Sequence, residues 1–153
     1  MSREILFKAK RLDNGEWVEG WLLKDEVTGQ WFIHASGNSV NESDKVNEEG
    51  CLRFIAFEVD ENTICQYTGL TDKNGNKIWE NDVIQYIDKD LVVNGVVRFG
   101  RHEQIVMLEL GFYVDWVSEG TECFKTDICY WVEKRNIEVI GNIFDNAELL
   151  KGE

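Results

Sequence analysis

Three carboxylates stand close together in the middle of the chain, at Asp72, Glu80 and Asp82. Paired carboxylates can exchange protons with a substrate or hold a divalent cation, so they are candidates for chemistry. A calcium-binding loop would alternate its ligands regularly and end in a distant glutamate. Here Gly75 comes one position too early for that pattern, and Lys73 adds an opposing charge. The segment therefore predicts a tight turn closed by its own side chains, and no metal site.

Nucleophilic and metal chemistry have few other candidates. The chain has two histidines, His34 and His102, and four cysteines that form no C-x-x-C pair. Structural zinc sites usually need closely spaced cysteine and histidine pairs. His102 stands between an arginine and a glutamate, which favours a solvated turn, while His34 alternates with Phe32 along a strand. The sequence leaves a Cys–His pair open but favours none, so we expect no catalytic residue and no cofactor.

The aromatic content is high, with six tryptophans in 153 residues. Trp17, Glu19 and Trp21 would share one face of a strand, because side chains alternate along a strand with a period of two. An exposed aromatic face is typical of a protein interface, whereas the alternative is that the indoles fill the core. We expect core positions for most tryptophans, and Trp17 and Trp21 are the candidate interface residues.

Sixteen basic and twenty-nine acidic residues give a net charge of −13. Such a field repels nucleic-acid phosphates and anionic lipids, so we expect no direct nucleic-acid binding and no membrane partner. The charge is compatible with a solvated acidic surface, with a basic protein partner, or with imitation of a nucleic acid. The first residues do not form a secretory signal, which favours a cytoplasmic location with reduced thiols.

The chain contains no proline, so its sharp turns must use glycine, asparagine or aspartate. Asn-Gly pairs at 14–15, 74–75 and 94–95 lie between apolar runs and predict hairpin turns. Thr28-Gly29 predicts another turn, and the polar residues 36–50 predict a loop. Strands are expected at 5–12, 17–23, 30–35, 52–59, 65–69, 83–87, 105–110, 112–117, 128–132 and 137–144, while residues 91–99 contain the Asn94-Gly95 turn. We also expect a bulge at Gly111 and a helical turn over 147–150.

The segment from Gln66 to Ile84, QYTGLTDKNGNKIWENDVI, combines turn chemistry with apolar anchors. A short strand ends in glycine, a polar reversal follows, and an apolar pair would attach that reversal to a core. We interpret the segment as a folding device. Its turn-forming signature comprises Gly69, Asp72, Asn74, Gly75, Trp79, Asn81 and Asp82.

Three stretches together resemble the YopX family of phage and prophage proteins. They are QYTGLTDKNGNKIWENDVIQY at 66–86, Gly95-Val96-Val97, and IEVIGNIFDNAELL at 137–150. The family usually has glycine where Asn81 stands, and asparagine is the next best residue at positive φ. A weaker similarity of residues 5–12, Gly15 and residues 17–23 to the family's opening strands extends the resemblance over nearly the whole chain. It implies a mainly β fold and a phage or prophage origin, and it names no catalytic residue.

We expect a mainly β protein of two parts. An N-terminal antiparallel meander over residues 1–63 would pack on a small, partly open C-terminal β-barrel over residues 64–153, with at most short helical turns. No linker-like composition separates the parts, so they are expected to form one unit.

Three functions stay open. The leading hypothesis is a phage or prophage accessory protein in the cytoplasm of a bacterial host, which is no enzyme and acts by protein binding, with self-association into a homo-oligomer. The second is an acidic nucleic-acid mimic that inhibits a host DNA-binding protein, with carboxylates in rows on one face. The third is an enzyme with a carboxylate site near residues 72–82.

Overall fold

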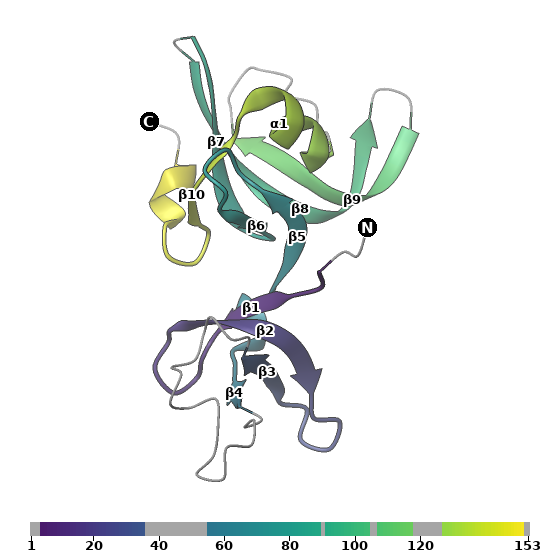
Figure 1. Cartoon of the computed structure of the whole chain (residues 1–153), viewed down its shortest axis with the longest axis vertical. Helices are drawn as coiled ribbons and strands as arrows, with labels where there is room; N and C mark the ends of the chain where they lie inside the picture. Colours follow the sequence, from purple (N-terminus) through teal and green to yellow (C-terminus); the bar gives the residue numbers. More distant parts are fainter. Residues whose placement is uncertain (1–3, 36–54, 90, 105–106, 118–126, 152–153) are drawn as a thin grey trace. The chain divides into compact units, whose positions relative to one another are not determined.

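The computed structural model describes residues 4–35, 55–89, 91–104, 107–117 and 127–151. These residues form two compact units, Met1–Tyr67 and Thr68–Glu153, and both are built mainly of β-strands (Figure 1). The predicted mainly β fold class is confirmed. The expected loop at 36–50 lies outside the described residues. No described helix is long and apolar enough to cross a membrane.

The N-terminal unit is the predicted antiparallel meander. Its turns use Gly15 and Gly29 at positive φ, as the Asn-Gly and Thr-Gly pairs predict. The strands are hydrogen-bonded in the order β4-β3-β2-β1-β5. They are β1 (Phe7–Lys10), β2 (Trp17–Lys24), β3 (Trp31–Ala35), β4 (Ala56–Glu58) and the first residues of β5 (Cys65–Thr71), with the 3-10 turn η2 (Glu61–Thr63) between β4 and β5.

Side-chain alternation divides this meander into a core face and an outward face. The core consists of Ala9, Val18, Ile33 and Val59, which are at most 3% exposed. Partly buried neighbours such as Phe57 pack against them. Because Val18 faces this core, the residues next to it on β2 must face the other way.

The C-terminal unit contains a hairpin-like pair and a four-stranded antiparallel sheet. The last residues of β5 pair with β6 (Lys77–Trp79), and the sheet has the order β10-β7-β8-β9. Its elements are β7 (Asp82–Asp88), β8 (Leu91–Gln104), β9 (Met107–Val117), α1 (Ile128–Arg135), β10 (Glu138–Asn142) and the 3-10 turn η3 (Ala147–Leu150). The described strands of this unit form no closed barrel.

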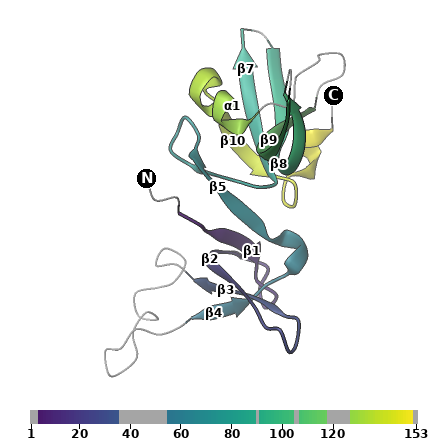
Figure 2. The ribbon, with the colours of Figure 1, turned by 90° about the vertical axis from the view of Figure 1, so that its right-hand side faces the viewer.

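The core of the C-terminal unit lies between this sheet and α1. Val97 and Val114 come from the β8–β9 hairpin, Ile84 from β7, and Ile128 and Trp131 from the helix. All five side chains are at most 9% exposed. The helix therefore covers one face of the sheet, as Figure 2 shows from the side.

The strand expected at 128–132 is wrong, because these residues begin α1. Asp127 accepts a hydrogen bond at Oδ1 from the backbone amide of Cys129 (2.7 Å), which satisfies one of the helix's free N–H groups. Ile128 and Trp131 are three positions apart and both face the core. The cap and this burial outweigh the β propensity of the side chains.

The turn expected at Asn94-Gly95 is also wrong, since β8 continues through both residues. The chain reverses earlier, at Lys89, which has a φ of +54°. Gly95 is buried and stands opposite Trp116 in the register of β8 and β9. Glycine is needed there because the indole of Trp116 occupies the space that a Cβ would take.

The two strands expected at 105–110 and 112–117 form one strand, β9, in its described part. Gly111 pairs directly with Gly100 in β8, so the register contains no bulge at this position. The hairpin of β8 and β9 is thus longer and more regular than the glycine pattern predicts.

Gly95→Ala tests the close approach of Trp116. A Cβ at position 95 would lie 2.7 Å from Trp116 Cε3 and 2.7 Å from Val114 Cγ1. Because this overpacks the core, we expect the free energy of unfolding in urea to fall by about 1–3 kcal/mol.

Gly111→Ala is the matched control on the neighbouring strand, because a Cβ there would meet nothing within 4 Å. We expect its stability to be unchanged or slightly raised. Equal effects of the two substitutions would contradict the role assigned to Gly95.

Candidate functional site

The outward face of the N-terminal meander is aromatic. Trp17 and Trp21 lie on β2 opposite to the core side, and Trp21 is 57% exposed. The ring of Trp21 stacks on His34 of β3, with 5.3 Å between the ring centroids and an angle of 6° between the planes. We call this surface the aromatic face; it comprises Trp17, Trp21, Leu23, Phe32 and His34, which the alternation along β2 and the register of β2 and β3 place on one side.

Two lysines of β1 border the aromatic face. The Nζ atoms of Lys8 and Lys10 lie 5.1 and 5.5 Å from the ring centroid of Trp17. Such cation–π contacts hold the indole in place and surround it with charge. Trp17 is only partly exposed, so Trp21 is the more accessible of the two predicted interface residues.

Most other tryptophans pack against a core, as expected. Trp79 and Trp131 are at most 9% exposed, and Trp31 and Trp116 pack against the two core clusters. This leaves Trp21 as the tryptophan with more than half of its surface exposed.

Asp72 closes the turn between β5 and β6. Its Oδ1 accepts hydrogen bonds from the backbone amides of Asn74 and Asn76, both at 2.9 Å. Its Oδ2 accepts from the Asn76 side chain at 3.1 Å and from the backbone amide of Val139 at 3.0 Å. Gly75 has a φ of +83°, which the reversal requires.

These bonds determine how Asp72 titrates. Burial by itself raises the pKa of Asp72, but the hydrogen bonds donated by Val139, Asn76 and Asn74 outweigh burial and hold the pKa below its ordinary value. A carboxylate that stays ionised and bonded in this way is suited to a structural role. It is a poor general acid at neutral pH.

Asn81 and Asp82 connect the signature to the sheet. Asn81 has a φ of +67°, and its backbone bonds Val97 of β8 and Ile143 near the end of β10. Asp82 is 2% exposed and accepts a hydrogen bond at Oδ2 from the amide of Trp79 (2.8 Å). Both residues therefore make contacts that hold the turn after β6.

Gly69 is also part of this arrangement. It has a φ of +87° within β5, a conformation that favours glycine. Next to it, the Thr68 hydroxyl donates to the Ile78 carbonyl at 2.7 Å. The signature residues thus lie in β5 and in and around the turns before and after β6, and both carboxylate oxygens of Asp72 accept hydrogen bonds within the fold.

A surface hollow of about 350 Å³ lies beside the C-terminal sheet. Lys73 and Glu138 form an ion pair of 2.6 Å at its wall, and Arg135 lies nearby. The hollow is lined by Lys73, Gln85, Ile87, Arg135, Asn136 and Glu138, so Asp72, Glu80 and Asp82 are not part of it.

The described cysteines show no activated thiol. Cys65 is 1% exposed and lies in the interior, as predicted. Burial raises the pKa of Cys129 to about 11, and the neighbouring Asp127 contributes to that rise. The Cys129 thiol is therefore protonated at neutral pH and is a weak nucleophile. Cys51 and Cys123 lie outside the described residues.

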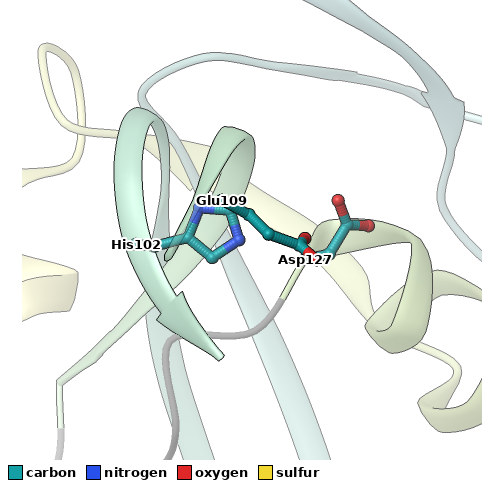
Figure 3. A group of neighbouring side chains, drawn as sticks. All are labelled: His102, Glu109 and Asp127. Carbon is teal, nitrogen blue, oxygen red and sulfur yellow. The ribbon is translucent and has the colours of Figure 1, made fainter. Parts of the chain in front are cut away.

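A second group of polar side chains joins the β8–β9 hairpin to the start of α1. His102 of β8, Glu109 of β9 and Asp127 each offer one ligand atom, and these atoms all lie within 4.8 Å of one another. Figure 3 shows Glu109 extending between the imidazole of His102 and the carboxylate of Asp127. The prediction that His102 is a solvated residue in a turn is wrong, because it lies within β8 and is 3% exposed.

Sequence reasoning missed this group because its members are far apart along the chain. His102 and Glu109 become neighbours only through the register of the hairpin, and Asp127 through the packing of α1. A prediction that pairs Gln104 with Met107 would also have paired the first two. No local pattern indicates the third.

The family described as YopX protein matches residues 6–151 of this sequence. The chain belongs to the YopX family. No curated protein matches the sequence. Among solved structures it is similar to protein EF1440 from Enterococcus faecalis, with 21% identity, coverage of 98% of this chain and 100% of that chain, and a TM-score of 0.46.

Asp72→Asn tests the central contact of the YopX signature. The substitution removes the charge that the three backbone amides bind, so we expect it to lower the free energy of unfolding at pH 7 by about 1.5–3 kcal/mol. The folded-state pKa of Asp72 is depressed, so its contribution is present above its ordinary pKa and is lost as pH falls below that value. The difference between wild type and variant should therefore shrink below about pH 4.

Asp25→Asn is the matched control. Asp25 also accepts hydrogen bonds from nearby backbone amides, those of Val27 and Thr28, but the turn is exposed. We expect a much smaller change in chemical unfolding at pH 7. If Asp72→Asn were as mild as Asp25→Asn, the structural role of Asp72 would be refuted.

Proposed function

We propose that this YopX-family chain is a phage or prophage accessory protein in the bacterial cytoplasm that acts by binding protein, with a second copy of itself as the first partner. The proposal gives it no catalytic activity. The observation that carries it is the 57% exposure of Trp21 on the aromatic face. Large aromatic side chains are enriched at protein interfaces and provide much of the binding energy there.

The chemistry of the aromatic face supports this role. Trp21 stacks on His34, so the indole is held in one orientation before any partner arrives. Leu23 beside it is 41% exposed, which extends the apolar area. Covering a rigid aromatic side chain costs little conformational entropy and removes a large apolar surface from water.

The charge of the protein affects how such an interface would form. Two copies that each carry −13 repel one another, and the repulsion is screened by salt. Lys8 and Lys10 beside Trp17 place positive charge at the border of the aromatic face, where it can approach acidic groups of a partner. We expect the screening of the net repulsion to outweigh the screening of these lysine contacts, so self-association through this face should become stronger with salt.

The non-catalytic part of the proposal is supported by the signature carboxylates. The oxygens of Asp72 and Oδ2 of Asp82 accept hydrogen bonds within the fold. The nucleic-acid mimic and the enzyme near residues 72–82 stay predictions from the sequence.

Trp21→Ala is expected to weaken self-association. Loss of a central aromatic contact costs about 2 kcal/mol, which raises the dissociation constant roughly 30-fold. Sedimentation velocity at several salt concentrations measures this change. Phe99→Ala is the matched control, because Phe99 is 51% exposed but lies in the C-terminal unit.

A photo-crosslinking amino acid at position 21, with position 99 as the control, tests for other partners in bacterial cells. We expect a crosslinked product from position 21 in clear excess over position 99. A strictly monomeric protein that forms no such product would contradict the proposal.

A further inference from the structure

We propose that His102, Glu109 and Asp127 bind one divalent transition-metal ion, with Zn²⁺ as its representative. The ion would connect the part of the β8–β9 hairpin that contains His102 and Glu109 to the start of α1. This site lies in the C-terminal unit and shares no residue with the aromatic face, so it does not depend on the proposed function.

Two separate features of the fold, a strand register and a β-bridge, bring the three residues together. His102 and Glu109 are direct partners in the antiparallel register of β8 and β9, so their side chains leave the hairpin on the same side. Asp127 forms an isolated bridge with Tyr113 of β9, which holds the start of α1 against the hairpin. The hydrogen bond from the Cys129 amide to Oδ1 orients the carboxylate of Asp127.

His102 supplies a second observation that points to a ligand. It is 97% buried, and its Nε2 atom has no hydrogen-bond partner among the described residues. Buried polar atoms are almost always satisfied, because leaving one unpaired costs free energy. Tyr113 stacks on the imidazole with 5.0 Å between the ring centroids, so the ring cannot easily rotate into solvent.

The other ring nitrogen favours the tautomer that a metal needs. Nδ1 lies 3.4 Å from the carbonyl oxygen of Gly100, which can only accept a hydrogen bond. If Nδ1 carries the proton, Nε2 presents a lone pair. Histidine ligands of metals commonly donate their second N–H to a backbone carbonyl in this way.

The ligand set selects the kind of ion. One imidazole nitrogen and two carboxylate oxygens suit Zn²⁺ or Mn²⁺ better than Mg²⁺ or Ca²⁺, which prefer oxygen ligands alone. Zinc bonds of about 2.0–2.2 Å place ligand atoms roughly 3–3.5 Å apart. The ligand atoms lie within 4.8 Å of one another, so binding would draw them together by at most roughly 1–2 Å and leave a position for water.

A proton could replace the metal in this group, because a protonated imidazole can also pair with two carboxylates. Nuclear magnetic resonance of the imidazole nitrogens distinguishes the two. The chain has two histidines, so His34 is an internal reference in the same spectrum.

The test uses the full chain, stripped of metal by a chelator and dialysed. Zinc chloride is added while calorimetry measures stoichiometry and the imidazole nitrogens are observed. We expect one ion per chain, a shift of His102 Nε2 while His34 stays unchanged, and a higher melting temperature with zinc. Manganese chloride should bind more weakly, and magnesium chloride should have no effect.

Glu109→Gln and Asp127→Asn remove the ligand charges and keep the shapes, and asparagine can still cap α1. Each should weaken zinc binding more than about tenfold. Glu133→Gln, at an exposed position on α1, is the matched control and should bind as the wild type does.

Wild-type affinity in both variants would show that zinc binds elsewhere and would overturn the proposal. An absence of any zinc-dependent change at His102 in the wild type would overturn it as well, even if a variant failed to fold. Equal shifts at His102 and His34 would show only adventitious binding and would also refute the site.

Discussion

The buried carboxylate of Asp72 connects the first turn of the C-terminal unit to its last strand. Three of its hydrogen bonds lie within the turn, and the fourth comes from Val139 in β10. A buried charge must be compensated, so neither the turn nor β10 can shift without leaving a charged or polar group unpaired. Asn81 adds a second connection, to Val97 and Ile143. The YopX signature thus connects the turns on either side of β6 to β8, to β10 and to Ile143.

Among the features that folding alone does not explain, two support the proposals, and one lies in each unit. In the N-terminal unit Trp21 exposes a large aromatic surface that burial would stabilise. In the C-terminal unit the Nε2 atom of His102 is buried without a partner among the described residues. The exposed indole of Trp21 is unfavourable because its apolar surface contacts water. The buried Nε2 atom of His102 is unfavourable because it has lost its hydrogen bonds to water. A protein partner and a metal ion would relieve them separately.

Local patterns were misleading where long-range packing overrides them. Asn94-Gly95 has the composition of a hairpin turn, but Lys89 reverses the chain first and the glycine accommodates Trp116. The stretch at 128–132 is rich in β-forming side chains, yet a cap at Asp127 and burial of Trp131 against the sheet favour a helix. In each case a contact with another strand adds to the local cause, since Trp116 of β9 packs against Gly95 and the sheet buries Trp131.

The sequence by itself determined the fold class, the meander with its glycine turns, the family, and the common strand face of Trp17 and Trp21. These follow from side-chain periodicity and from φ preferences, which are local properties. Only the tertiary structure decided which tryptophan is exposed and that His102 meets Glu109 and Asp127. Those outcomes depend on strand register and on the packing of α1, and both are set by contacts between residues far apart in the chain.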